Sequence, residues 1–168
     1  MGSGRNAGTA GSGMTGGAVA GDGAGTARLL GYAGLIPFAA GALACWLDPA
    51  WLPWAPDYAL AAYGAVILSF VGAVHWGRLV APGAARDPHA AGWFVWSNVP
   101  ALLGWAALLL PAAARLALLI AALALAWAVD RHAFATGRYP AWFARLRTHL
   151  TLGACASLAA GLAGVLAR

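Results

Sequence analysis

The stretch that decides the fold is Tyr58–Val80, which reads YALAAYGAVILSFVGAVHWGRLV. About 20 consecutive apolar residues are enough for one helix to cross the hydrocarbon core of a bilayer. This stretch has that length, and its histidine, His75, and its charged residue, Arg78, both stand near its end. The sequence therefore predicts a membrane-spanning helix here, with polar side chains close to one membrane surface.

The composition of the whole chain supports a membrane protein. Apolar residues make up 62% of the 168 residues and charged residues only 9%, whereas about 25% of a typical soluble domain is charged. These values exclude an ordinary soluble enzyme, a disordered chain and a disulfide-rich domain. The net charge of +5 does not indicate nucleic-acid binding, because the Arg residues are spread between apolar runs rather than clustered on one face.

Four further runs have the length and composition of membrane spans. The run from Trp93 to Val129 would form a helix of about 55 Å, which is too long for one crossing, so Pro111 divides it. The fold class is therefore all-α, with a single five-helix transmembrane domain over residues 28–168. Residues 1–27 contain ten Gly, have little to bury and are expected to form a disordered tail. The five predicted spans are Leu29–Leu47, Tyr58–Val80, Trp93–Leu110, Ala112–Val129 and Leu150–Ala167.

The placement of Arg predicts the orientation in the membrane. Two of the ten, Arg115 and Arg168, fall on one side, and the other eight fall on the side of the N-terminus. Because cytoplasmic loops carry the excess of bases, the N-terminus is expected inside and the C-terminus outside. A chain rich in Ala, Gly and Arg and without Lys suits a bacterium of high genomic GC content. We therefore expect a multi-pass protein of a bacterial cytoplasmic (inner) membrane.

The loop before the last span has an amphipathic pattern of its own. Pro140 is a suitable first helical residue, and the apolar side chains that follow share one face, with Arg145 and Arg147 towards the other. These apolar residues are Trp142, Phe143, Leu146 and Leu150. We interpret residues 140–149 as an interfacial helix held by anionic lipid. The alternative is a surface that binds a partner protein.

Small residues at four-residue spacing predict close helix packing in two spans. One set lies in the second span and the other in the fifth. These positions are Ala65, Ser69, Ala73, Gly77, Gly153, Ser157 and Gly161. They favour a compact bundle or a dimer. The two cysteines, Cys45 and Cys155, fall at different depths and are expected to stay free thiols.

Polar residues from separate spans gather at one level near the cytoplasmic side. The candidate cluster consists of His75, Ser97, Asn98, Asp130 and Arg131. Ionisable groups within a membrane are costly and usually face the bundle interior. One reading is a cytoplasm-facing pocket for a proton or a small polar ligand. In the other, His75 and Asn98 hold helices together, while Asp130 pairs with Arg131. The sequence has no catalytic, metal or cofactor motif, so neither an enzyme nor a bound cofactor is expected.

Several motifs carry a resemblance to a known family. They are Leu30–Phe38, Tyr63–Phe70 followed by His75-Trp76-Gly77, Ser97–Pro100, Asp130-Arg131, and Pro140–Phe143 with Leu146-Arg147 and Leu150-Thr151. In order and spacing the chain resembles a small bacterial membrane family of unknown function that also includes the mitochondrial transmembrane protein 69. The resemblance covers about residues 28–167. It implies a five-span helical membrane protein without an established activity, and it supplies no catalytic residues.

Two functions remain open at this point. The first is a structural or accessory protein that lies in the lipid bilayer and packs with itself or with a larger membrane complex. The alternative is a small proton-linked transporter or carrier that uses His75, Asn98 and Asp130. An open cavity lined by these three residues favours the carrier, and a dry, hydrogen-bonded cluster favours the structural protein.

Overall fold

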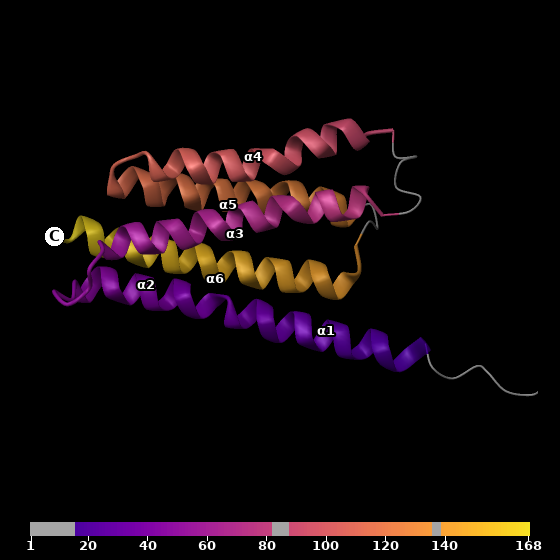
Figure 1. Ribbon diagram of the computed structural model, residues 1–168, viewed down its shortest axis with the longest axis horizontal. Coiled ribbons are helices and arrows are strands. Elements are labelled where there is room, and N and C mark those ends of the chain that lie inside the picture. The colour runs from indigo at the N-terminus through magenta and orange to yellow at the C-terminus, as the bar shows by residue number, and fades with distance from the viewer. Residues whose placement is uncertain (1–15, 82–87, 136–138) are drawn as a thin grey trace, which may run out of the picture.

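The described chain is a bundle of helices. The computed structural model describes residues 16–81, 88–135 and 139–168, with side chains from residue 23 onward. Figure 1 shows the helices lying side by side along one axis, with α1 and α2 following each other in one line. No strand occurs in these ranges, so the all-α fold class is confirmed. The helices are α1 (Gly16–Ala33), α2 (Leu35–Leu47), α3 (Pro56–Leu79), α4 (Ala90–Leu108), α5 (Ala112–Ala135) and α6 (Ala141–Leu166).

Within the described residues, four helical segments are long and apolar enough to cross a membrane. They are Gly23–Leu47, Pro56–Leu79, Ala112–Ala135 and Ala141–Leu166, and they correspond to four of the predicted spans. The remaining predicted span corresponds to α4, which packs along α3 (Figure 1). Ser97, Asn98 and three Trp lower the hydropathy of α4. The chain is a multi-pass membrane protein, while the fifth crossing and the N-in orientation stay predictions.

The first predicted span is interrupted at Gly34, between α1 and α2. Pro37, in the first turn of α2, has no N–H to continue the ladder to the carbonyl of Ala33. Instead the carbonyl of Gly34 accepts a hydrogen bond of 2.9 Å from the Tyr63 hydroxyl of α3. This hydrogen bond therefore fixes the position of the segment around Gly34 along the axis of α3.

Part of the segment that was predicted to be a disordered tail is helical. The chain is already helical from Gly16, so the expectation of disorder was wrong for residues 16–27, and residues 1–15 lie outside the described part. Extending an existing helix adds one hydrogen bond per residue, whereas nucleating a new helix is costly. The packed end of α1 supplies that nucleus.

The predicted interfacial helix and the last predicted span form one continuous helix, α6. Pro140 stands just before it with an extended backbone (ψ 146°), and the first helical residue is Ala141. A separate interfacial helix was expected because apolar residues share one face, with Arg145 and Arg147 towards the other. Arg147 is instead buried and held by Asp130 within the bundle. The helix can therefore continue without a bend.

Small residues bring α3 and α4 together, although at a different face from the predicted one. A Cβ atom on Gly72 would collide with the backbone carbonyl oxygen of Ser97, and one on Gly104 would lie 3.2 Å from Ala65. Of the predicted α3 positions, Ala65 is buried and Ser69 half-buried, but Ala73 and Gly77 are exposed. Gly72, which falls outside the predicted four-residue series, is the position that permits the close approach.

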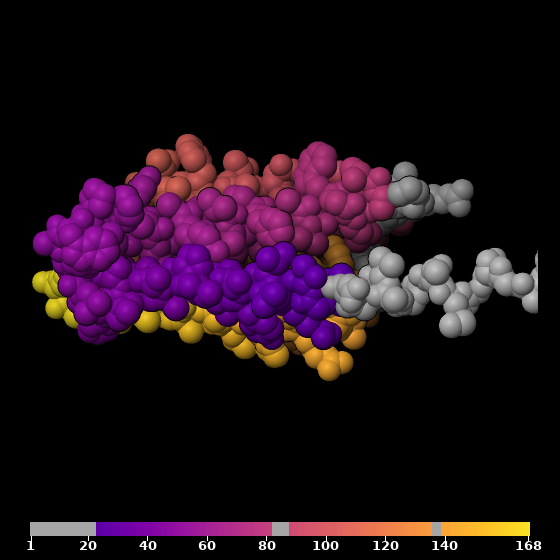
Figure 2. Space-filling model, turned by 60° about the horizontal axis from the view of Figure 1, so that its bottom comes forward, coloured from indigo at the N-terminus to yellow at the C-terminus, as the bar shows by residue number. Residues whose placement is uncertain are grey.

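The predicted small residues of α6 lie along α2. A Cβ atom on Gly153 would lie 2.8 Å from the side chain of Leu35. One on Gly161 would meet Leu60 and approach the sulfur of Cys45 at 3.5 Å. Ser157 between them is half-buried and donates to the carbonyl of Gly153 at 2.9 Å. Figure 2 shows α1 and α2 running along the bundle between α3 and α6.

The end of the bundle opposite the candidate cluster is held by two ion pairs. Asp57 lies 3.0 Å from Arg115, and Asp48 lies 2.7 Å from Arg168. The hydrogen bond that the Arg168 guanidinium donates to Asp48 raises the pKa of this exposed arginine. Both cysteines are free, as the sequence predicted. The start of α3 is thus tied to the start of α5, and the residue that ends α2 is tied to Arg168 after α6.

Candidate functional site

The centre of the candidate site is the carboxylate of Asp130, which binds a histidine and an arginine side chain from two other helices. Oδ1 lies 2.9 Å from Nε2 of His75 on α3. Oδ2 accepts a hydrogen bond of 2.8 Å from Nε of Arg147 on α6. Their side chains are only 3–9% exposed. Asp130 on α5 therefore joins three helices through one buried group.

Neighbouring side chains complete the site. The Tyr139 hydroxyl lies 3.3 Å from Nδ1 of His75. With the His75 proton on Nε2, the ring donates to Asp130 and accepts from Tyr139, so both ring nitrogens are satisfied. The ring also stacks on Trp93 of α4, with 5.0 Å between the centroids. Arg147 Nη1 donates to the Thr151 hydroxyl at 2.7 Å. The result is a chain of polar contacts that joins α3, α5 and α6, with Trp93 of α4 stacked on its histidine.

Three of the five predicted cluster residues make their contacts elsewhere. Ser97 is buried but donates to the Trp93 carbonyl at 2.6 Å, within its own helix. Asn98 is exposed, and its Nδ2 donates to the Phe94 carbonyl at 2.8 Å. Arg131 is exposed and lies over the ring of Trp127 at 5.0 Å. Among the predicted cluster residues, the structure brings His75 and Asp130 together.

The sequence analysis missed the role of Arg147 as the partner of Asp130. A signal was present on α6, because Arg147 shares a face with Ala154, Leu158 and Gly161 at spacings of seven, eleven and fourteen residues. That face is buried. The amphipathic pattern of residues 142–150 suggested a different face. Asp130 lies 17 residues before Arg147, with other Arg residues nearer in sequence.

The site is nearly closed. A cavity of about 10 Å³ borders His75, Asp130 and Arg147, which is room for one water at most. Both oxygens of Asp130 are already used. Within the described residues there is no group of His, Cys, Asp and Glu that could hold a metal ion. This arrangement can hold helices together and can pass a proton between His75 and its neighbours.

A second polar contact links α1 to α6 at the same end. The Tyr32 hydroxyl lies 2.9 Å from Nδ1 of His149, and both residues are exposed. Arg28 lies over the ring of Trp142, 5.8 Å from the centroid. These contacts place the start of the first predicted span beside the start of α6.

Comparison with known protein families shows which family the chain belongs to. Residues 24–163 match the model of a family described as "Protein of unknown function (DUF3429)". The chain belongs to this family. The DUF3429 match covers all the residues of the Asp130 site and every helix except the first part of α1 and the last turn of α6. The resemblance inferred from the sequence is confirmed, although a bacterial origin is not shown.

Two curated relatives carry the name Transmembrane protein 69. The protein of Xenopus tropicalis is 37% identical over 138 residues, which cover 81% of this chain and 53% of the relative. That of Mus musculus is 32% identical over 120 residues, covering 71% of this chain and 48% of the relative. This DUF3429 chain thus spans about half the length of these relatives. No solved structure matches it.

Proposed function

We propose that this DUF3429 protein is a structural or accessory component of a membrane, without enzymatic activity. The observation that carries the proposal is the Asp130 carboxylate, which binds His75 and Arg147 from two other helices in a nearly closed site. In lipid, apolar surfaces alone do not determine which helices pack together. Buried polar contacts such as those of Asp130 therefore specify which helices are neighbours. The small cavity argues against a polar pathway through the cluster.

The partner we propose is a second copy of the chain or a larger membrane complex. In support, Ala73 and Gly77 lie on an exposed face of α3, and a Cβ atom on Gly77 would meet nothing within 4 Å. Small residues allow another helix backbone to approach closely. We also propose a bacterial inner membrane with the N-terminus inside, on the basis of Arg placement and the absence of Lys.

A proton-linked carrier is the second candidate, and one observation favours it. Tyr139, His75 and Asp130 form a continuous series of groups that can each bear a proton. Such a series can exchange protons if water reaches both ends during a conformational cycle.

Reconstitution into vesicles separates the two candidates. The purified chain is placed in vesicles that contain a pH-sensitive dye, a pH gradient is imposed, and wild type is compared with Asp130→Asn and Asn98→Ala. Asn98→Ala is the control, because Asn98 bonds only within its own helix. If the protein is structural, vesicles that contain it show no more proton flux than empty vesicles. The purified protein then also has a defined native mass above that of a monomer. Flux that Asp130→Asn abolishes and Asn98→Ala retains would overturn the proposal in favour of the carrier. A strictly monomeric mass of the purified chain would overturn the second copy as its partner.

A further inference from the structure

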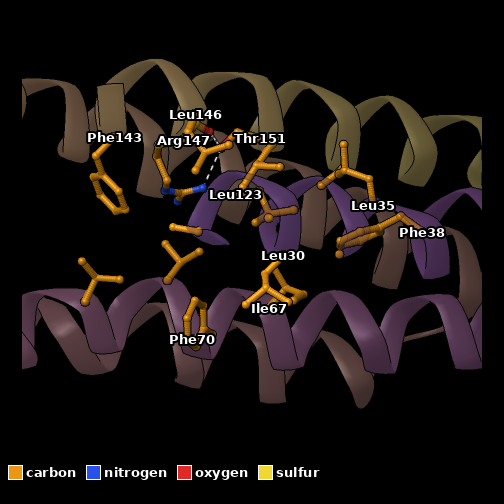
Figure 3. A pocket seen from close by; sticks show the side chains of 17 residues that line it. Leu30, Leu35, Phe38, Ile67, Phe70, Leu123, Phe143, Leu146, Arg147 and Thr151 are labelled. Carbon is orange, nitrogen blue, oxygen red and sulfur yellow. Dashed lines mark hydrogen bonds between the residues drawn. The ribbon is translucent and has the colours of Figure 1, made fainter. Parts of the chain in front are cut away.

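A large apolar pocket lies next to the Asp130 site. Its volume is about 490 Å³, within the range of about 300–1,000 Å³ usual for small-molecule pockets. Residues of α1, α2, α3 and α6 line it, with one leucine from α5. Nearly all the lining side chains are apolar, among them Leu30, Leu35, Phe38, Ile67, Phe70 and Phe143. Arg147 and Thr151 are the polar exceptions (Figure 3).

The length of the pocket fits an acyl chain. Its wall on α6 runs from Phe143 to Ala154, which is about 16 Å of helix axis. One leaflet contributes about 15 Å to the hydrocarbon core. The rim residues Leu30 and Phe70 are 67% and 70% exposed, so the pocket opens sideways, towards the lipid that surrounds a membrane helix. A lipid chain can therefore enter from the bilayer without crossing a polar barrier.

Arg147 supplies the charged end of the pocket. In Figure 3 its guanidinium points into the enclosed space near Phe143, while Leu35 and Phe38 mark the other end. Nε and Nη1 are bound to Asp130 and Thr151. Nη2 is buried and has no hydrogen-bond partner among the described residues. A buried N–H of a charged group without an acceptor is costly, so the pocket wall carries a donor that needs an acceptor.

The charges at this end favour an anion as that acceptor. Arg28, Arg131 and Arg145 are exposed there, and the negative charge of Asp130 is shared between His75 and Arg147. Basic pockets between membrane helices on the cytoplasmic side bind anionic head groups. A phosphate matches a guanidinium better than a carbonyl does, because its hydrogen bonds are charge-assisted.

We propose that the pocket binds one acyl chain of an anionic phospholipid, whose phosphate accepts hydrogen bonds from Nη2 of Arg147. The chain fills the space between α1, α2, α3 and α6, and the head group lies at the end where α1 meets α6. Nη2 is buried, so the Arg147 side chain must shift for this hydrogen bond to form. The lipid is then a bound part of the fold, which goes beyond the proposed structural role.

The test is native mass spectrometry of the full chain in neutral detergent, titrated with three probes. These are phosphatidylglycerol, diacylglycerol with the same acyl chains, which lacks the phosphate, and palmitate. Wild type is expected to bind one phosphatidylglycerol at least about tenfold more tightly than diacylglycerol, from one charge-assisted contact. Equal affinities would overturn head-group recognition by Arg147. Tighter binding of palmitate would overturn the phospholipid and assign the pocket to a free fatty acid.

Three variants locate the site. Arg147→Met is expected to remove the preference for phosphatidylglycerol. Because Arg147 also holds the bundle together, a second variant keeps the test decisive: Ile67→Trp fills the pocket far from Arg147 and is expected to weaken phosphatidylglycerol binding about tenfold. Its control is Val66→Trp, since Val66 is 63% exposed and points away from the pocket. Phosphatidylglycerol binding by Ile67→Trp that equals that of Val66→Trp would overturn the proposed location.

Discussion

Replacing Asp130 by Asn tests whether the buried carboxylate holds the bundle together. The change keeps the shape of the side chain but removes the charge that faces His75 at 2.9 Å and Arg147 at 2.8 Å. One carboxylate oxygen becomes an NH2 group, so a hydrogen-bond donor of the new Asn faces the donor nitrogen of His75 or Arg147. Removing one partner of a buried ion pair costs about 3–5 kcal/mol, because the remaining charge is left uncompensated. We expect the free energy of unfolding to fall by that amount.

The assay is reversible unfolding of the purified protein in mixed micelles, followed by circular dichroism as a denaturing detergent is added. Asp48→Asn is the matched control, because its pair with Arg168 is 37–55% exposed. Exposed ion pairs contribute little, so Asp48→Asn is expected to unfold close to wild type. An Asp130→Asn protein as stable as Asp48→Asn would refute the reasoning.

A double-mutant cycle with Arg147→Met separates the ion pair from general damage. Once Arg147 is neutral, the loss of the Asp130 charge no longer strands a buried cation. The double variant is therefore expected to be more stable than the sum of the single losses indicates, by about 0.5–3 kcal/mol. Strictly additive losses would mean that the two side chains do not act on each other.

The remaining predictions concern helix packing and the break between α1 and α2, each measured with the same unfolding assay. Gly72→Ala is expected to cost about 1–3 kcal/mol, because the new methyl group meets the backbone oxygen of Ser97. Gly77→Ala, with open space around it, is expected to be neutral or to gain up to about 1 kcal/mol of helix propensity, and a loss comparable to that of Gly72→Ala would contradict the packing argument. Tyr63→Phe is expected to cost about 0.5–1.5 kcal/mol, since the Gly34 carbonyl loses its donor; an unchanged stability would mean that water replaces the hydroxyl.

The spans could be predicted from the sequence because membrane length is a strong constraint. A run of about 20 apolar residues has few other solutions. The predicted span Tyr58–Val80 therefore lies close to the bounds of α3, and Ala112–Val129 begins with α5, although α5 continues to Ala135. The break at Gly34 was harder to predict, because it depends on a hydroxyl from another helix. Hydropathy carries no information on such contacts.

The candidate site was predicted only in part, for a reason that lies in helix geometry. His75 and Asp130 were placed at the same depth because each stands near the end of a long apolar run. Depth alone does not give the direction in which a side chain points, and Asn98 at a similar depth faces outward. Direction follows from the packing of α4 against α3, which is set by Gly72 and Gly104. In a chain with 23 Gly, these two positions do not stand out.

The scarcity of acids makes each of them informative about the fold. Asp48, Asp57 and Asp130 are the acids whose side chains the structure describes, and each binds a cation from a distant part of the chain. Lipid solvates every apolar helix face about equally well, so apolar contacts alone leave several arrangements of these helices close in energy. Asp57 and Asp130 have side chains that are only 15% and 7% exposed, so either of them beside the wrong neighbour would remain without a partner, at a cost of several kcal/mol. The ion pairs at the two ends of the bundle therefore select one arrangement from many. The same logic explains why Arg147 can sit inside α6 without bending the helix out of the membrane.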